Sequence, residues 1–399
     1  MLLTDLIIMK TFIYLILFLL SCTVIHAQSF TMNQGGATVK NYYVELPYAV
    51  INGKIIVSVE IAGEKHRFIF DTGAPVIVSK ELTAQIKAEV INNNRLRDAN
   101  GGYDSVSVVR LNGIMLGNVN FNAIPAIGTL PELYKCWNVD GVIGSNIFRN
   151  SIVSIQSDKR LIIITDQANK LTLNKKHSVP LITNENNDTQ SDPVIKVMLG
   201  KKVSLTLEFD TGDAGFLRFS NDYMNQLSKY AVYEVIDKGY GASQFGGHGL
   251  QDNSDKYLLK IPSLTIGEGY FNNVITETNK GGSAAIGCRL LDYGNVTLDF
   301  INSRFYFDAR NETNDLYEKH WPIRPTVIGN KLVVGVVWTK ALNQVKPGEQ
   351  IMAVNEKAFP EFNLCDMINR QPIIAGTDSA TVTIKDAEEK ERLIDIVKE

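Results

Sequence analysis

The chain has 399 residues, of which 45% are hydrophobic and 21% are charged, as in a soluble globular protein large enough for two or three domains. Its 40 Lys and Arg residues nearly balance its 43 Asp and Glu residues, which leaves a formal net charge of −3. This balance produces no strong field of one sign, so nucleic acid and an anionic membrane surface are not expected as partners.

The N-terminus predicts a secretory signal peptide over residues 1–27. Lys10 precedes an apolar run at 11–20, and small residues follow that run. Cleavage after Ala27 would release a free exported protein. An alternative stays open, because Leu-Leu-Ser-Cys at 19–22 reads as a lipoprotein box in which a lipidated Cys22 tethers the protein to a membrane. A retained anchor needs about 20 apolar residues, and this run is marginal for that length.

Most segments beyond the leader predict β-strands. Short runs rich in β-branched residues, for instance 54–61, 67–70, 151–164 and 295–307, alternate with Gly, Asn and Asp turns. The body of the protein is therefore expected to be mainly β.

Two copies of one pattern follow each other along this body. In each copy an apolar strand runs into Asp-Thr-Gly, at 71–73 and at 210–212, and a later apolar element ends in Gly144 or Gly287. The two Asp residues are 139 positions apart (210 − 71) and the two Gly residues 143 (287 − 144). An offset this constant indicates an internal duplication.

The duplicated tripeptide suits a pair of catalytic carboxylates. Two carboxyl groups held close together cannot both ionise easily, so one can act as an acid while its neighbour acts as a base toward water. In such a loop Asp lies at the tip, Thr can form hydrogen bonds across to the other loop, and Gly permits a tight turn. A single Asp-Thr-Gly is as readily an ordinary turn. The duplication therefore favours Asp71 and Asp210 as a catalytic pair.

These motifs resemble the pepsin and retropepsin superfamily of aspartic peptidases over roughly residues 40–310. The resemblance is carried by 70–74 and 209–213, together with the hydrophobic-hydrophobic-Gly elements 142–144 and 285–287. It implies a bilobal double barrel that hydrolyses peptide bonds and needs no cofactor. The residues to which it assigns roles are the catalytic Asp71 and Asp210 and the loop-supporting Thr72, Gly73, Thr211 and Gly212.

The same resemblance implies a β-hairpin flap over the substrate. Its candidate is the turn at Gly101, Gly102 and Tyr103, with Tyr103 as the flap aromatic, and a plain hairpin tip is the alternative. The counterpart in the second copy, 239–249, contains Phe245 and His248 and is expected to shape a wall for the substrate.

One departure from the superfamily leaves a second function open. Asp213 adds a carboxylate directly after Gly212, and we expect it to point to solvent. Because it lies so close to Asp210, the alternative is a catalytically weak or inactive envelope protein that binds peptides without cutting them.

After about residue 311 the pattern changes to a small α+β module. It predicts strands at 331–338, 379–385 and 391–397 and a helix within 361–370, and its segment 345–355 resembles a PDZ domain. That resemblance implies the addition of an extended peptide to a sheet edge. No carboxylate-binding loop matches, so a purely structural tail is the alternative. The expected domains are a signal peptide at 1–27, lobes at 28–175 and 176–311, and a PDZ-like domain at 312–399.

The cysteines and histidines predict neither disulfides nor a metal site. Cys136, Cys288 and Cys365 are an odd, scattered set, so stability is expected to come from packing. Neither they nor the histidines have the spacing of metal ligands. An aspartic-peptidase body with a PDZ-like tail resembles bacterial exported proteins. A monomer acting on peptides or proteins in the periplasm, at the cell envelope or outside the cell is therefore expected.

Overall fold

The computed structural model describes residues 30–97, 103–183, 191–246, 249–281, 283–370, 372–374 and 378–399. The predicted leader, with Cys22, lies outside these residues. Within them, no helix has the length and apolar character needed to cross a membrane. Residues Met32–Glu399 form one compact unit, to which the following description applies.

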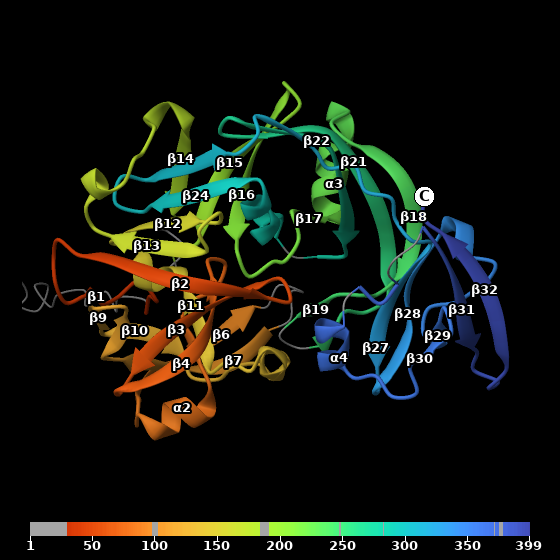
Figure 1. Ribbon diagram of the computed structural model, residues 1–399, viewed down its shortest axis with the longest axis horizontal. Helices are drawn as coiled ribbons and strands as arrows, with labels where there is room; N and C mark the ends of the chain where they lie inside the picture. The colour runs from red at the N-terminus through yellow and green to blue at the C-terminus, as the bar shows by residue number, and fades with distance from the viewer. Residues whose placement is uncertain are drawn as a thin grey trace, which may run out of the picture. The chain divides into compact units, whose positions relative to one another are not determined.

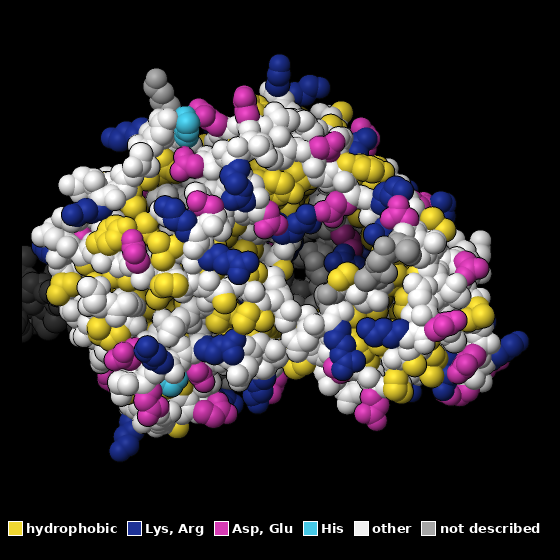
Figure 2. Space-filling model, viewed as in Figure 1, with side chains coloured by type: hydrophobic (Ala, Val, Ile, Leu, Met, Phe, Trp, Pro, Cys, Tyr) yellow, Lys and Arg dark blue, Asp and Glu magenta, His cyan; other side chains and the backbone are white. Residues whose placement is uncertain are grey.

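Strands make up most of the described chain, so the prediction of a mainly β fold with barrel-like sheets is confirmed (Figure 1). The α-helices among the described residues are short: α2 (Lys80–Gln85), α3 (Asn221–Leu227) and α4 (Leu364–Asn369). Side chains of both charge signs are interspersed over the face shown in Figure 2, as the nearly neutral net charge leads one to expect.

In the first copy, a parallel strand lies behind the Asp-Thr-Gly loop. Strand β4 (Glu64–Asp71) pairs in parallel with β11 (Gly141–Gly144), and β11 pairs on its other side with the antiparallel β5 (Ile77–Val78). Strand β5 in turn lies parallel to β10 (Ile124–Ile127). The elements of this copy are β2 (Tyr43–Ile51), β3 (Lys54–Ile61), β4 (Glu64–Asp71), β5 (Ile77–Val78), α2, β6 (Glu89–Arg97), β7 (Tyr103–Leu111), β8 (Ile114–Leu116), β9 (Val119–Asn122), β10 (Ile124–Ile127), the 3₁₀ helix η1 (Glu132–Trp137), β11 (Gly141–Gly144), η2 (Ser145–Phe148), β12 (Ile152–Gln156) and β13 (Leu161–Thr165), preceded by β1 (Gly36–Ala37).

The second copy repeats these pairings. Strand β16, which ends at Asp210, is parallel to β23, which pairs with the antiparallel β17, and β17 is parallel to β22. This identical set of pairings is the internal duplication seen in the sequence. Its elements are β14 (Ser178–Thr183), β15 (Pro193–Leu199), β16 (Val203–Asp210), β17 (Leu217–Ser220), α3, β18 (Glu234–Gly241), β19 (Phe245–Gly246), β20 (Gly249–Leu250), β21 (Ser254–Ile266), β22 (Gly269–Asn279), β23 (Ala285–Gly287), η6 (Cys288–Asp292), β24 (Gly294–Asp299), β25 (Arg304–Ala309) and β26 (Thr313–Asp315), with the short 3₁₀ helices η3 (Ala168–Lys170) and η4 (Lys175–His177) before β14 and η5 (Ser228–Tyr230) after α3.

A six-stranded antiparallel sheet joins the two copies in the order β2-β13-β12-β24-β25-β14. At its centre, β12 of the first copy pairs with β24 of the second, and the buried hydroxyl of Thr297 donates to that of Ser154 at 2.9 Å. One hydrophobic core includes residues from both copies, among them Phe70 and Phe209. The ends of β4 and β16 are therefore held in a single packed body.

The C-terminal module consists of β27 (Ile323–Ile328), β28 (Lys331–Trp338), η7 (Thr339–Ala341), β29 (Gln350–Val354), β30 (Lys357–Ala358), α4, β31 (Ser379–Lys385) and β32 (Glu391–Val397). Its expected strands at 331–338, 379–385 and 391–397 are present, and it has a hydrophobic core of its own. Its β28 also pairs with β18 of the second copy through Gly239 and Trp338. The PDZ-like identity and the domain boundaries at 175 and 311 stay predictions.

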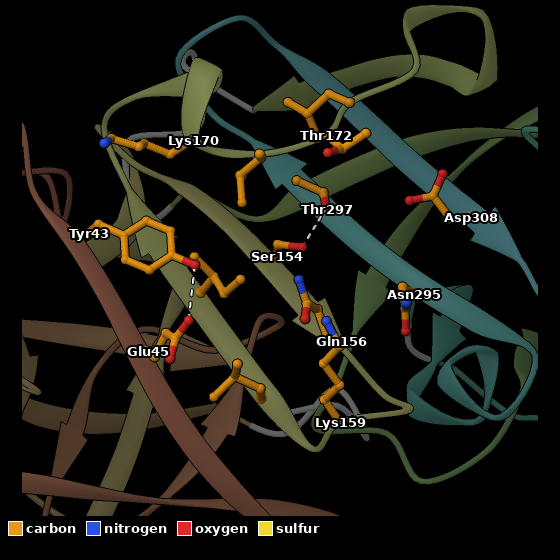
Figure 3. A pocket seen from close by; sticks show the side chains of 14 residues that line it. Tyr43, Glu45, Ser154, Gln156, Lys159, Lys170, Thr172, Asn295, Thr297 and Asp308 are labelled. Atoms are coloured by element: carbon orange, nitrogen blue, oxygen red, sulfur yellow. Dashed lines mark hydrogen bonds between the residues drawn. The ribbon is translucent and has the colours of Figure 1, made fainter.

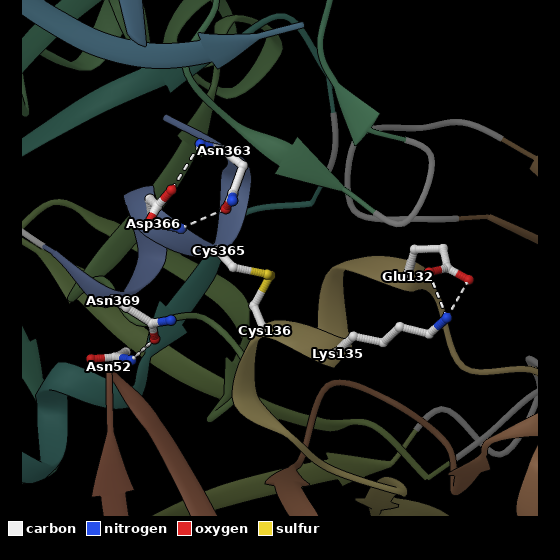
Figure 4. The surroundings of a disulfide bond; sticks show 8 residues. All are labelled: Asn52, Glu132, Lys135, Cys136, Asn363, Cys365, Asp366 and Asn369. Carbon is white, nitrogen blue, oxygen red and sulfur yellow. Dashed lines mark hydrogen bonds and ion pairs between the residues drawn. A yellow bond between two sulfur atoms is a disulfide. The ribbon is translucent and has the colours of Figure 1, made fainter. Parts of the chain in front are cut away.

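The expectation that the cysteines form no disulfide is wrong. Cys136 in η1 is bonded to Cys365 in α4, 229 positions later, with Cα atoms 4.8 Å apart (Figure 4). Cys288 is the free cysteine of the described chain. Tertiary packing alone brings η1 next to α4, so no pattern of cysteine spacing revealed the pair.

Asn146 provides a test of how the first copy is held together. Its fully buried side chain accepts a hydrogen bond from the Val76 amide at 2.9 Å and donates to the carbonyls of Met32 and Pro125. We expect Asn146→Ala to lower the free energy of unfolding by about 2–4 kcal/mol, because three backbone groups lose their partner. The exposed Asn253→Ala is the control and should change it by less than about 0.5 kcal/mol. Equal urea midpoints for both variants would contradict this account.

Candidate active site

The two predicted catalytic residues lie side by side. Asp71 and Asp210 end equivalent strands, and their exposed fractions are only 6% and 9%. A Cβ atom added to Gly73 would lie 2.6 Å from Cγ of Asp210, and one added to Gly212 would lie 2.2 Å from Oδ2 of Asp71. Each carboxyl group therefore lies against the glycine of the opposite loop, and a larger residue there would displace it.

Reciprocal hydrogen bonds lock the two Asp-Thr-Gly loops together. The Thr72 hydroxyl donates to the Phe209 carbonyl at 2.6 Å and accepts from the Thr211 amide at 3.0 Å. The Thr211 hydroxyl does the same with the Phe70 carbonyl and the Thr72 amide, both at 3.0 Å. Thr72 and Thr211 thus have the geometry expected of loop-supporting residues.

The hydrophobic-hydrophobic-Gly elements support each loop from behind. Gly144 pairs with Asp71 and Gly287 with Asp210, and an added Cβ would lie 2.1 Å from the Ala74 carbonyl in the first case and 2.3 Å from the Gly215 carbonyl in the second. Only glycine lets the supporting strand approach this closely.

Backbone amides orient both carboxyl groups. The Gly73 amide donates to Oδ1 of Asp71 at 3.0 Å, and the Gly212 and Asp213 amides donate to Oδ1 of Asp210 at 2.8 and 3.2 Å. These contacts leave the second oxygen of each carboxyl group for other partners.

The surroundings of Asp71 favour its protonated form. Burial raises the pKa of the Asp71 carboxyl well above its ordinary value, and the Asp210 charge and a hydrogen bond between the two carboxyl groups raise it further. The ammonium group of Lys54 acts in the opposite direction. The pair is therefore suited to hold one proton, with Asp71 as its site.

Arg218 is a site residue that sequence reasoning missed. It lies in β17, and its Nη1 donates to Oδ2 of Asp210 at 3.2 Å and to Oδ2 of Asp213 at 2.9 Å. The expectation that Asp213 points to solvent is thus wrong, because its carboxylate is paired with this guanidinium. No motif marked Arg218, since only the pairing of β17 with β23 brings it beside Asp210.

Glu208 adds another acidic group to this cluster. It precedes Asp210 by two residues in β16, and its carboxylate lies 3.8 Å from Nη2 of Arg218. Burial, followed by the charges of Asp210 and Asp192, raises the pKa of the Glu208 carboxyl well above its ordinary value. The cluster around Arg218 is thus mainly acidic and enclosed.

A second cation, Lys54, approaches the pair from β3. Its ammonium group donates to the Gly212 carbonyl and lies 5.5 Å from the ring centroid of Trp137 in η1. Tyr134 in the same helix packs on Trp137, with ring centroids 6.2 Å apart. Burial, together with the charges of Asp71 and Asp210, raises the pKa of the Tyr134 hydroxyl. Sequence reasoning did not single out any of these three residues.

The predicted flap lies partly outside the described residues. Strands β6 and β7 form the expected hairpin, with Tyr103 opposite Arg97, but Gly101 and Gly102 at the turn are not described. The flap role of Tyr103 stays a prediction. In the second copy, Phe245 packs against the core of the C-terminal module, while His248 is outside the described residues.

One concave surface of the protein lies away from the acidic pair. It has a volume of about 470 Å³ and lies on the six-stranded sheet, where Tyr43, Gln156, Asn295 and Asp308 contribute to its lining (Figure 3). Neither Asp71 nor Asp210 lines it. Among the described residues, no group of three His, Cys, Asp or Glu side chains could hold a metal ion.

Comparison with known protein families identifies one match, which includes the first Asp-Thr-Gly loop. Residues 57–147 match the family described as aspartyl protease, which covers less than half of the chain. No curated protein matches the chain. Similar solved structures include a retropepsin-like aspartic protease from Rickettsia conorii (18% identity, 31% of this chain and 92% of that one, TM-score 0.24), an aspartic proteinase from Irpex lacteus (10%, 67% and 97%, 0.34) and basic 7S globulin from soybean (12%, 68% and 96%, 0.37). At these TM-scores the structural likenesses carry no conclusion about activity.

The locked loops can be tested with two substitutions at Thr72. Thr72→Val keeps the shape but removes the hydroxyl, so the buried Thr211 amide and Phe209 carbonyl lose their partner. We expect a loss of about 2–4 kcal/mol in the free energy of unfolding. Thr72→Ser retains the hydroxyl and should cost less than about 1.5 kcal/mol. Urea unfolding of both variants provides the measurement, and equal losses would show that the hydroxyl contributes nothing.

Proposed function

We propose that this protein is an aspartic endopeptidase that hydrolyses peptide bonds with a water molecule activated by Asp71 and Asp210. The observation that carries the proposal is the placement of these two buried carboxyl groups side by side, each against the glycine of the opposite loop. The match of residues 57–147 to the aspartyl protease family supports it.

The surroundings of the pair suggest which carboxyl group holds the proton. Burial and the neighbouring charge favour protonated Asp71, whereas Asp210 accepts hydrogen bonds from the Arg218 guanidinium and from two backbone amides. Asp210 would then remove a proton from the attacking water, while Asp71 donates one to the oxygen of the peptide carbonyl. This division needs no covalent intermediate.

A second function, peptide binding without cleavage, is favoured by one observation. Both oxygens of Asp210 already accept hydrogen bonds within the protein, Oδ1 from backbone amides and Oδ2 from Arg218. A carboxylate occupied in this way has fewer free lone pairs with which to bind and orient an attacking water molecule. The PDZ-like C-terminal module would serve this function as well, by binding an extended peptide.

Export of the protein is part of the proposal. Disulfides persist in oxidising compartments, so the Cys136–Cys365 bond supports a location in the periplasm, at the cell envelope or outside the cell. Whether the leader is cleaved after Ala27 or lipidated at Cys22 concerns residues outside those described. The partner we propose is a peptide or protein substrate bound by a monomer.

Substitution of either Asp tests the catalytic assignment. We expect Asp71→Asn and Asp210→Asn each to reduce kcat/KM by about 1,000-fold or more, because the amide can neither give nor take the required proton. Cleavage of a defined peptide mixture, followed by mass spectrometry between pH 3 and 8, provides the measurement. The control is Asp222→Asn, an exposed position in the first turn of α3. Full activity in both Asp variants would disprove the assignment, and a wild-type protein that binds these peptides without cutting them would establish the second function.

Arg218 should orient Asp210 for its part in the reaction. In Arg218→Met the Asp210 and Asp213 carboxylates lose the guanidinium that binds both of them. We therefore expect kcat/KM to fall by about 10- to 100-fold, because small displacements in a catalytic site have effects of this size. Arg218→Lys keeps a positive charge but not the planar set of donors, so it should restore only part of the loss. Equal kcat/KM values for the wild type and Arg218→Met would show that Arg218 does not act on the pair.

A further inference from the structure

The helix η1 is connected to the acidic pair through Lys54. The Lys54 ammonium group bonds to the Gly212 carbonyl in the second loop and lies over the ring of Trp137. Trp137 is 7% exposed, and its indole donates to the Ile51 carbonyl at 3.2 Å. Tyr134 packs on the same ring. The position of η1 therefore determines what surrounds Asp71 and Asp210 on this side.

Little in η1 itself holds it in place. It is a 3₁₀ helix of six residues, its N-cap residue Pro131 makes no side-chain capping bond, and it ends at Asn138 with a left-handed φ of 51°. Short 3₁₀ segments have poor hydrogen-bond geometry and are not stable alone. The helix must therefore depend on tertiary contacts.

The strongest of these contacts comes from the C-terminal module. Cys136 of η1 is bonded to Cys365 of α4, and beside this bond the amide group of Asn52 donates to Oδ1 of Asn369 at 2.6 Å (Figure 4). Asn363 fixes the start of α4 through a capping box. The disulfide thus joins the module to η1. The hydrogen bond between Asn52 and Asn369 joins the module to the β2–β3 turn, two residues before Lys54.

The same module also holds the second copy. Its β28 pairs with β18, the Ala242 amide donates to the Gly335 carbonyl at 3.0 Å, and Phe245 packs on the module's core. Strands β18 and β21 pair in the second copy as β6 and β7 do in the first. The module therefore contacts elements of both copies, and one of them is the counterpart of the predicted flap hairpin.

We propose that the C-terminal module is a positioning element of the peptidase site, and that the Cys136–Cys365 bond holds η1 so that Tyr134 and Trp137 form one wall of the substrate cleft. This inference rests on the proposed function. In this proposal the module supports the cleft, and it can also bind a peptide of its own. Loss of the bond should let η1 move away and admit water to the acidic pair.

The test compares Cys136→Ser/Cys365→Ser with the wild type and with Lys319→Ala, which removes an exposed ion pair to Asp378 near the C-terminal module. We expect the double variant to lose about 10- to 100-fold in kcat/KM, because small displacements in a catalytic site have effects of this size. Its alkaline limb should move to lower pH, since burial is the main cause of the raised pKa of Asp71. Lys319→Ala should behave like the wild type. An unchanged kcat/KM and pH profile in the double variant would overturn the proposal.

Two further measurements distinguish a failure of this inference from a failure of the proposed function and from misfolding of the variant. The access of solvent to Trp137, obtained from acrylamide quenching of fluorescence by difference from the matching Trp137→Phe proteins, needs no peptidase activity. If the wild type cleaves nothing, the proposed function fails. Stronger quenching of Trp137 in the double variant then still supports the wall, whereas unchanged quenching overturns it. If the double variant does not fold, the Tyr134→Ala variant tests the wall instead. Loss of a wall residue must change KM or the preferred cleavage site, whereas Tyr134→Phe should largely preserve both. An unchanged KM and cleavage site in Tyr134→Ala would overturn the proposal.

Discussion

The reciprocal hydrogen bonds between the Thr72 and Thr211 loops are the constraint on which the site depends. Two acidic side chains repel each other once ionised, and burying them costs free energy, so nothing in the pair itself holds them together. Each threonine hydroxyl bonds to the backbone on both sides of the opposite Asp, and each motif is supported from behind by a parallel strand. The rigid backbone thus keeps Asp71 and Asp210 adjacent against their repulsion.

The two halves of the site are alike in backbone but not in charge. Lys54 acts on the Asp71 carboxyl, whereas Asp210 is bonded to Arg218, which also binds Asp213. The guanidinium therefore distinguishes the two carboxyl groups, and it occupies one oxygen of Asp210. The proposed cleavage and the alternative of binding without cleavage both assign a part to this contact.

The C-terminal module is integrated with the body of the protein. It is joined to the first copy by the Cys136–Cys365 bond and to the second by the pairing of β28 with β18. An independent binding domain needs none of these connections. They place the module in contact with η1 and with the hairpin of the second copy, which is the basis of the positioning role proposed for it.

Local patterns and their repetition were sufficient to predict the mainly β fold, the duplication, and the meeting of Asp71 with Asp210 and of Thr72 with Thr211. The strands depend on residues that are adjacent in sequence. The meeting of the two loops depends on two copies of one unit that pack together symmetrically. Arg218, Lys54 and the Cys136–Cys365 bond lie outside the repeated motifs, and the outward direction expected for Asp213 was wrong because its partner comes from a neighbouring strand. Such contacts are decided only by the tertiary structure, because the packing of distant segments determines which side chains meet.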